Sequence, residues 1–299
     1  MWGHLGNGVF YHDYGNVYIS NMNKLATLGP KGTYSEAAAL KYLRSNNEAY
    51  EIEYFGSIKK ALNSVGDECD LAVLPIENFS EGFVSLVLDH IIDSDLSIIS
   101  EITLPIKFSF VTNTRANSKI SRLFVQFVAK GQCSEYLETL GDIDIISTES
   151  NIESLNMVIN APDNSSAIVP FGSFNLDDFN TIIENVNDYK NNQTRFLVLS
   201  KARREIDANS NSNWKTSLVI LDDHDRPGLL AEILTSFAIR SINLTSIISR
   251  PTRVEFGRYN FLIDIVSYSE DESVAEAIKE ISLIAKVKNM GSYPVAKIV

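Results

Sequence analysis

A hydroxyl and a fixed cation stand side by side near the middle of the chain. Thr194 and Arg195 precede residues 196–199, a short apolar run that predicts a buried strand. Arginine presents a planar fork of donors that matches a carboxylate at two points, and a hydroxyl can hydrogen-bond a leaving group. Such a pair could bind an anion and act on its reacting end. A structural salt bridge is an equally good interpretation of the arginine in an acidic protein.

A second group of polar side chains follows the apolar run 71–74, which predicts another buried strand ending at Pro75. Asn78 can donate two hydrogen bonds and accept others, and Glu77 and Glu81 could serve as acid, base or helix cap. Open α/β sheets bind their ligands at the carboxyl ends of strands, where these residues are expected to lie. A plain loop with a capping glutamate is the alternative.

A glycine-rich turn at residues 29–33 separates a predicted strand, 25–28, from a helix that begins near Ser35. Glycines leave backbone amides free, and the dipole of the following helix adds positive potential, so Gly32 and Thr33 could form a small anion site. The turn lacks the long glycine-bounded loop of a phosphate-binding P-loop, and an ordinary turn explains it equally well.

The C-terminal part contains a similar turn. Residues 227–230, Pro-Gly-Leu-Leu, open a predicted helix, and Asn243 begins a predicted strand. Amides freed by the glycine could meet the carboxylate of an amino acid. On these residues alone, an ordinary helix start and a core strand are the favoured interpretation.

The elements that must position these groups fall into two domains. Strands and helices alternate over residues 22–203, which predicts an α/β domain. A polar linker at 204–213 follows, and residues 214–299 show the order βαββαβ of a ferredoxin-like domain. Residues 1–21 are an extension or a mis-assigned start, because Met22 opens a more typical N-terminus.

Composition excludes several classes of partner. The 299-residue chain carries a formal net charge of -12, which argues against nucleic acid and anionic membranes. It has no apolar run long enough to span a bilayer and no recognisable signal peptide. Cys69 and Cys133 are too far apart in sequence for a metal or redox motif, so free thiols and a cytoplasmic location are expected.

Several motifs together resemble one enzyme family. GPKGTYSEAA, the stretch from Asp70 to Asp89 containing LPIEN, and NNQTRF occur in the order and spacing of prephenate dehydratases. PGLL and INLTSIISRP are similar to the ACT domain that follows in those enzymes. The resemblance covers nearly all of residues 24–296.

The resemblance implies a two-lobed, periplasmic-binding-protein-like catalytic domain followed by an ACT domain, and a homodimer or homotetramer. It implies no metal and no cofactor. Prephenate would lie between the lobes, where Thr194 helps its hydroxyl leave and Arg195 is a carboxylate binder or a structural anchor. Asn78 and Glu77 complete the catalytic candidates. The substrate-binding candidates are Gly32, Thr33, Glu81, Gly82, Gln132 and Phe196, and the effector-binding candidates are Pro227, Gly228, Leu229, Leu230 and Asn243.

The chain departs from the family at several polar positions. Phe79 replaces a serine, Val87 a threonine, and residues 104–108 and 125–133 have lost histidines and other polar groups. Expulsion of hydroxide needs a placed donor, whereas loss of CO2 is aided by an apolar setting. The departures therefore favour a prephenate decarboxylase of specialised metabolism, which would form non-aromatic dihydro-4-hydroxyphenylpyruvate. A prephenate dehydratase of phenylalanine biosynthesis is the first alternative, and a non-catalytic sensor of aromatic metabolites is the second.

The predicted regulatory site departs from the family as well. Phenylalanine-responsive ACT domains carry Glu-Ser-Arg-Pro, and here Ile248 stands in place of the glutamate. Isoleucine cannot supply a carboxylate, so weak or absent phenylalanine inhibition is expected.

Overall fold

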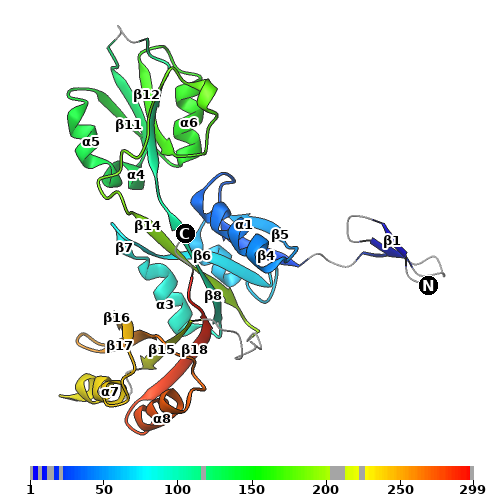
Figure 1. Cartoon of the computed structure of the whole chain (residues 1–299), viewed down its shortest axis with the longest axis vertical. Coiled ribbons are helices and arrows are strands. Elements are labelled where there is room, and N and C mark those ends of the chain that lie inside the picture. Colours follow the sequence, from blue (N-terminus) through cyan, green and yellow to red (C-terminus); the bar gives the residue numbers. More distant parts are fainter. Residues whose placement is uncertain are drawn as a thin grey trace.

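The structure is a computed structural model that describes residues 23–115, 119–202, 213–221 and 226–296. It also describes the backbone of three short strands, β1 (Gly3–Leu5), β2 (Val9–Tyr11) and β3 (Val17–Ile19), which pair with one another. The remainder of the predicted extension and all of the predicted linker except Asn213 lie outside the described residues. Figure 1 shows three successive bodies after these strands: two lobes and a C-terminal domain.

The first lobe is built on a mixed sheet in the order β5-β4-β6-β14-β8, with β7 paired to β6. Its strands are β4 (Lys24–Leu28), β5 (Glu51–Phe55), β6 (Leu71–Asn78), β7 (Gly82–Phe83), β8 (Ser97–Pro105) and β14 (Gln193–Ser200), and its helices are α1 (Tyr34–Asn46), α2 (Ile58–Asn63) and α3 (Ser85–Asp93). Helix α1 packs Ala38, Ala39 and Tyr42 against one face of the sheet, while α2 and α3 contribute to the core on the other. Strand β14 lies between β6 and β8, so its backbone is paired on both sides.

The second lobe holds a sheet in the order β11-β10-β12-β9-β13. Its elements are β9 (Phe108–Thr112), β10 (Arg122–Gln126), α4 (Phe127–Gln132), α5 (Ser134–Thr139), β11 (Asp144–Thr148), α6 (Asn151–Ile159), β12 (Ser165–Pro170), the 3-10 turn Leu176–Asp178 and β13 (Thr181–Ile183). The chain crosses between the lobes after β8 and returns before β14. This two-lobed α/β arrangement confirms the predicted fold class.

The C-terminal domain has the expected order βαββαβ and a four-stranded antiparallel sheet, β16-β17-β15-β18. Its elements are β15 (Trp214–Leu221), α7 (Leu229–Ala238), β16 (Leu244–Pro251), β17 (Tyr259–Ile265), α8 (Glu272–Ile281) and β18 (Lys286–Pro294). Leu229, Ile233 and Phe237 of α7 pack with Val274 and Ala277 of α8 over one face of this sheet. The ferredoxin-like prediction is confirmed.

Strand β6 does not end at Pro75, contrary to the prediction. It continues to Asn78, and its pairing with β14 shifts register so that Phe196 faces Pro75 and Arg195 faces Glu77. Proline lacks a backbone donor and is tolerated in a sheet where the ladder is irregular. The bulge therefore lets β6 carry Glu77 and Asn78 alongside β14.

The C-terminal domain packs directly on the first lobe. A Cβ built on Gly291, whose φ is +132°, would lie 2.2 Å from the Ile98 carbonyl oxygen, so β18 approaches β8 as only glycine permits. Arg250 binds Asp89 of α3 through Nε and Nη2, at 2.6 and 2.9 Å. Lys288 donates to the carbonyl groups of Ile91 and Ile92 at the end of α3. The C-terminal domain thus contacts the first lobe at two places, through the close approach of β18 to β8 and through polar contacts at α3.

Within the described segments, no helix combines the length and apolarity needed to cross a membrane.

Candidate functional site

The candidate site is organised around one rung of the β6–β14 ladder. Thr194 pairs with Asn78, and the Asn78 side-chain amide donates to Thr194 Oγ1 over 2.8 Å. Thr194 is 8% exposed, so this hydrogen bond is largely shielded from water. The Thr194 hydroxyl makes no other hydrogen bond to the described part of the chain. Its oxygen is therefore an acceptor in this bond, and its proton remains available to a ligand.

The orientation of the Asn78 amide is fixed by the turn that follows it. Asn78 Oδ1 accepts from the Ser80 backbone amide at 3.0 Å, the Ser80 hydroxyl at 2.7 Å and the Glu81 amide at 3.1 Å. A side-chain oxygen with three donors cannot exchange places with the nitrogen, so Nδ2 must face Thr194. Asn78, Ser80 and Glu81 are thus joined by hydrogen bonds within one turn.

The same amide begins a chain of hydrogen bonds that reaches the second lobe. Asn78 Nδ2 lies 3.1 Å from Asn192 Oδ1, and Asn192 Nδ2 donates to Gln132 Oε1 over 2.8 Å. Asn192 and Gln132 are 2% and 4% exposed, and Gln132 ends α4. The sequence analysis singled out Gln132 but missed Asn192, although Asn192 stands in the NNQTRF motif two residues before the threonine.

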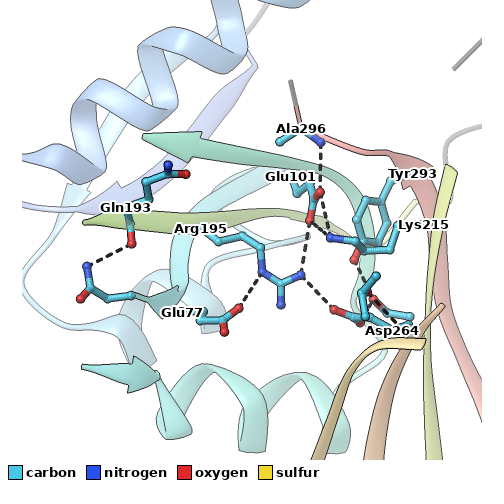
Figure 2. Close-up of polar contacts among 11 residues, drawn as sticks. Glu77, Glu101, Gln193, Arg195, Lys215, Asp264, Tyr293 and Ala296 are labelled. Atoms are coloured by element: carbon cyan, nitrogen blue, oxygen red, sulfur yellow. Dashed lines mark hydrogen bonds and ion pairs between the residues drawn. The ribbon is translucent and has the colours of Figure 1, made fainter. Parts of the chain in front are cut away.

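Arg195 and Glu77 form the neighbouring rung, and their side chains contact a different part of the molecule. Successive residues of a strand point to opposite faces of its sheet. The Arg195 guanidinium contacts Glu101 at 3.3 Å and Asp264 of the C-terminal domain at 2.9 Å, as Figure 2 shows. Arg195 Nε lies 3.3 Å from Glu77, without hydrogen-bond geometry.

These contacts set the electrostatic environment of Arg195. Burial opposes its charge, but the Asp264 and Glu101 carboxylates outweigh burial and raise its pKa above the ordinary arginine value. Three carboxylates, those of Glu77, Glu101 and Asp264, already surround the guanidinium, and the contact with Asp264 joins the first lobe to the C-terminal domain. Glu77 accompanies Arg195 and is turned away from the face of β6 that carries Asn78, so neither residue is placed to touch a ligand at Thr194.

The glycine-rich turn is also occupied by the chain itself. The Gly32 amide donates to Glu36 Oε2 over 2.5 Å, and Thr33 Oγ1 caps α1 by accepting from the Glu36 amide at 3.5 Å. The predicted free anion site at Gly32 is therefore filled by a carboxylate from the first turn of α1. The spacing Thr-x-x-Glu of a capping box is the sequence signal for this arrangement. Gly32 instead approaches the second lobe, because a Cβ at this position would lie 2.8 Å from Ile152.

Two further residues beside the site are parts of the hydrophobic core. Phe196, expected to contact substrate, is 1% exposed and packs with Leu25, Ala38 and Tyr42. Phe196 lies two residues beyond Thr194, in the buried part of β14, and has no access to a ligand there. Burial raises the pKa of the Cys133 thiol to about 12, so this free cysteine is not a nucleophile at neutral pH.

A pocket of about 730 Å³ lies where the turn after Asn78 meets the second lobe. Glu81 comes from the first lobe, while Phe127, Val128 and Lys130 come from α4. Phe127 is 75% exposed and Val128 42% exposed, an unusual degree for such apolar side chains. Gly82, at φ +78°, follows Glu81 and turns the chain into β7. Thr194 and Asn78 are not among the residues that line this pocket.

The C-terminal domain has a smaller pocket, of about 290 Å³, at the start of α7. Gly228, Leu229 and Leu230, three of the predicted effector-binding residues, line it. Pro227 and Asn243 are not among its lining residues, and Asn243 is solvent-exposed. Residues of β15 and β17 also line the pocket, and its remaining lining residues are Ile220, Leu221, Arg226, Ala231, Gly257, Tyr259 and Phe261.

Comparison with known proteins identifies two family models along the chain. The model described as prephenate dehydratase matches residues 25–204, and the model described as ACT domain matches residues 218–282. The prephenate dehydratase of Methanocaldococcus jannaschii is 35% identical over 269 residues, which cover 89% of this chain and 96% of that protein. The prephenate dehydratase of Mycobacterium tuberculosis is 32% identical over 289 residues, covering 91% of this chain and 87% of that protein.

Solved structures give the same result. Prephenate dehydratase from Arthrobacter aurescens, determined in complex with L-Phe, superposes with a TM-score of 0.75 at 30% identity and covers 91% of this chain and 90% of its own. Prephenate dehydratase from Staphylococcus aureus has a TM-score of 0.71 at 28% identity, with coverages of 90% and 99%. The similarity therefore extends over both lobes and the C-terminal domain.

Proposed function

The chain belongs to the prephenate dehydratase family, and from this premise we propose that it converts prephenate to phenylpyruvate, carbon dioxide and water. One observation carries the proposal. The Thr194 hydroxyl is held by a donated hydrogen bond from Asn78, and its own proton has no acceptor in the described part of the chain. A hydroxyl held in this way is suited to hydrogen-bond a departing hydroxide.

The proposed reaction removes two groups from the prephenate ring. The ring carboxylate leaves as CO2, and its bonding electrons enter the ring as the C–O bond to the ring hydroxyl breaks. The departing hydroxide takes up the proton of the Thr194 hydroxyl and leaves as water, Thr194 regains a proton from solvent, and the ring becomes aromatic. Thr194 donates to the departing oxygen, and the Asn78 amide stabilises the negative charge that develops on Oγ1. Donation from Asn78 also strengthens the outgoing hydrogen bond, because hydrogen bonds in a chain polarise one another.

The other proposed roles follow from position. Asn192 and Gln132 hold Asn78 from the second lobe, so the relative placement of the lobes sets the position of the amide. Lys130 supplies a cation in the pocket of the second lobe that Glu81 borders, and such a cation suits one carboxylate of a dianion. Thr33 and Gly32 shape the turn that meets α6. No metal or cofactor takes part in this proposal.

Decarboxylation without loss of water is the second candidate. Phe127 and Val128, which stand where the family motif has proline and glutamine, are exposed and line the pocket beside Glu81. An apolar pocket favours loss of CO2 from a carboxylate, although desolvation as an aid is contested. The intact contact between Thr194 and Asn78 supports dehydratase activity more strongly, because protonation of the ring does not require a donor to the hydroxyl.

The stoichiometry of the reaction separates these candidates. In a stirred assay with prephenate at neutral pH, we expect CO2 and phenylpyruvate to be released in equal amounts. CO2 release without phenylpyruvate would support decarboxylation alone. Binding of prephenate without either product would support the third possibility, a sensor, which the retained Thr194 hydroxyl argues against.

We further propose that the pocket at the start of α7 takes a small effector, and we predict weak or absent inhibition by L-Phe. Ile248 packs against the hydrophobic core shared with the first lobe and does not line this pocket. It also supplies no carboxylate for an amino group. Initial rates should therefore change little with L-Phe into the millimolar range. Half-maximal inhibition at micromolar L-Phe, with matching affinity by calorimetry, would contradict this prediction.

A further inference from the structure

The buried ion pairs behind Thr194 connect the strand of the candidate site to the C-terminal domain. Arg195, next to Thr194 on β14, contacts Asp264 of β17 at 2.9 Å and Glu101 of β8 at 3.3 Å. Lys215 of β15 binds the same Glu101 at 2.8 Å. We call Arg195, Glu101, Lys215 and Asp264 the interdomain cluster; Figure 2 shows how they converge from both domains. The Glu101 and Asp264 side chains are each 2% exposed.

Asp264 is held firmly from its own domain. The Ser217 hydroxyl donates to Asp264 Oδ1 over 2.6 Å and lies 2.7 Å from the hydroxyl of Tyr293. The single proton of the Ser217 hydroxyl is used in the hydrogen bond to Asp264. In the hydrogen bond between Ser217 and Tyr293, the tyrosine hydroxyl must therefore be the donor. Tyr293 can do this at any ordinary pH, because burial raises its pKa well above the usual tyrosine value. Asp264 Oδ2 is thereby aimed at Arg195.

Stability alone does not account for such a cluster. Charges buried at an interface lose their hydration, and well-packed apolar residues often stabilise a protein as well or better. Buried ion pairs do, however, fix one geometry, because an offset leaves a charge unpaired in a medium of low polarity. A cluster adjacent to the catalytic candidate is placed to fix the position of β14.

The β6–β14 ladder is irregular beside this cluster. The register between the two strands shifts between Arg195 and Phe196, one rung beyond the pair Thr194–Asn78. The extra residue of this bulge is Ile76 of β6, so the pairing of β14 is disrupted locally on its β6 side and continues on its β8 side. The Arg195 side chain holds the strand at this bulge, and Asp264 holds Arg195.

We propose that Asp264 is a positioning residue of the C-terminal domain, which sets the placement of Thr194 through Arg195. The inference rests on the proposed function only in taking Thr194 as the catalytic hydroxyl. It makes the C-terminal domain part of the working active site, because a carboxylate of that domain restrains the strand that carries the hydroxyl.

The test compares two variants that break interdomain ion pairs at different places. Asp264→Asn removes the charge that faces Arg195. Asp89→Asn is the matched control. It removes the carboxylate of α3 that binds Arg250 and Arg253, and it leaves β14 untouched. Steady-state kinetics with prephenate should show kcat about 10- to 100-fold lower for Asp264→Asn, the cost of a small misplacement of a reacting group, with KM nearly unchanged. The control should keep kcat.

Equal loss of kcat in both variants, or an unchanged kcat in Asp264→Asn, would overturn the inference. Should Asp264→Asn fail to fold, Ser217→Ala removes only the hydroxyl that aims Asp264, and the same loss of kcat is expected in weaker form. A wild-type protein without turnover would count against the proposed function instead. Hydrogen exchange of the peptide 193–200 then decides the inference: faster exchange in Asp264→Asn than in Asp89→Asn supports it, and equal exchange overturns it.

Discussion

Replacement of Thr194 by valine is expected to lower kcat for phenylpyruvate formation by about 10²–10⁴-fold, the usual contribution of a positioned proton donor. Valine keeps the shape of threonine and removes only the hydroxyl. The Asn78 amide retains Asn192 Oδ1 at 3.1 Å and the Gln193 carbonyl oxygen at 3.3 Å as acceptors, so no buried donor is left without a partner. The loss should therefore appear in catalysis more than in folding.

Thr194→Ser is the matched control for this prediction. Serine keeps a hydroxyl that can accept from Asn78 and donate to the substrate, so its kcat should stay much closer to that of the wild type. Rates are measured from the absorbance of phenylpyruvate, and folding is checked by circular dichroism. A valine variant with near wild-type kcat would show that Thr194 does not assist the leaving hydroxyl.

The largest effect on stability is expected for Glu101→Gln. Glu101 accepts from Lys215 at 2.8 and 3.0 Å, from Arg195 at 3.3 Å and from the Ala296 amide at 3.0 Å. Removing one charge of a buried ion pair leaves the others uncompensated, which typically costs about 3–5 kcal/mol. Guanidinium denaturation followed by fluorescence should show a loss of this size in the free energy of unfolding.

Glu53→Gln provides the comparison. Glu53 forms an exposed ion pair with Lys24 at 3.4 Å, and both side chains are more than two-fifths exposed. Exposed pairs contribute little to stability, so the denaturation midpoint should not change measurably. If Glu101→Gln were as mild as this control, the cluster would not be shielded from water, and the argument for its positioning role would lose its basis.

The motifs singled out both residues of the central contact but did not predict the contact itself or its surroundings. Thr194 and Asn78 lie in two motifs 116 residues apart, and the structure joins them by a hydrogen bond. That both motifs serve one site could be inferred from their order and spacing within a family. The role of Asn192 required coordinates, because its amide links Asn78 to Gln132 of the second lobe, and neither contact can be inferred from the sequence.

The partner of Arg195 could not be predicted from the sequence. An arginine beside a candidate catalytic residue could form an ion pair with many carboxylates in a chain with 38 acidic residues. Arg195 pairs with Asp264, which is 69 residues away and in the other domain. This pairing depends on how β14 and β17 are placed relative to each other. The Gly32 turn shows the opposite case, since the capping-box spacing of Thr33 and Glu36 is a sequence signal from which a carboxylate of the chain could have been expected at this turn.

Identification of the product tests the central claim most directly. Purified protein is mixed with prephenate at neutral pH, the ultraviolet spectrum is followed, and the product is identified by mass. The account predicts aromatic phenylpyruvate, formed with loss of both CO2 and water. A non-aromatic product that has lost CO2 but retains the elements of water would contradict it and establish decarboxylation alone.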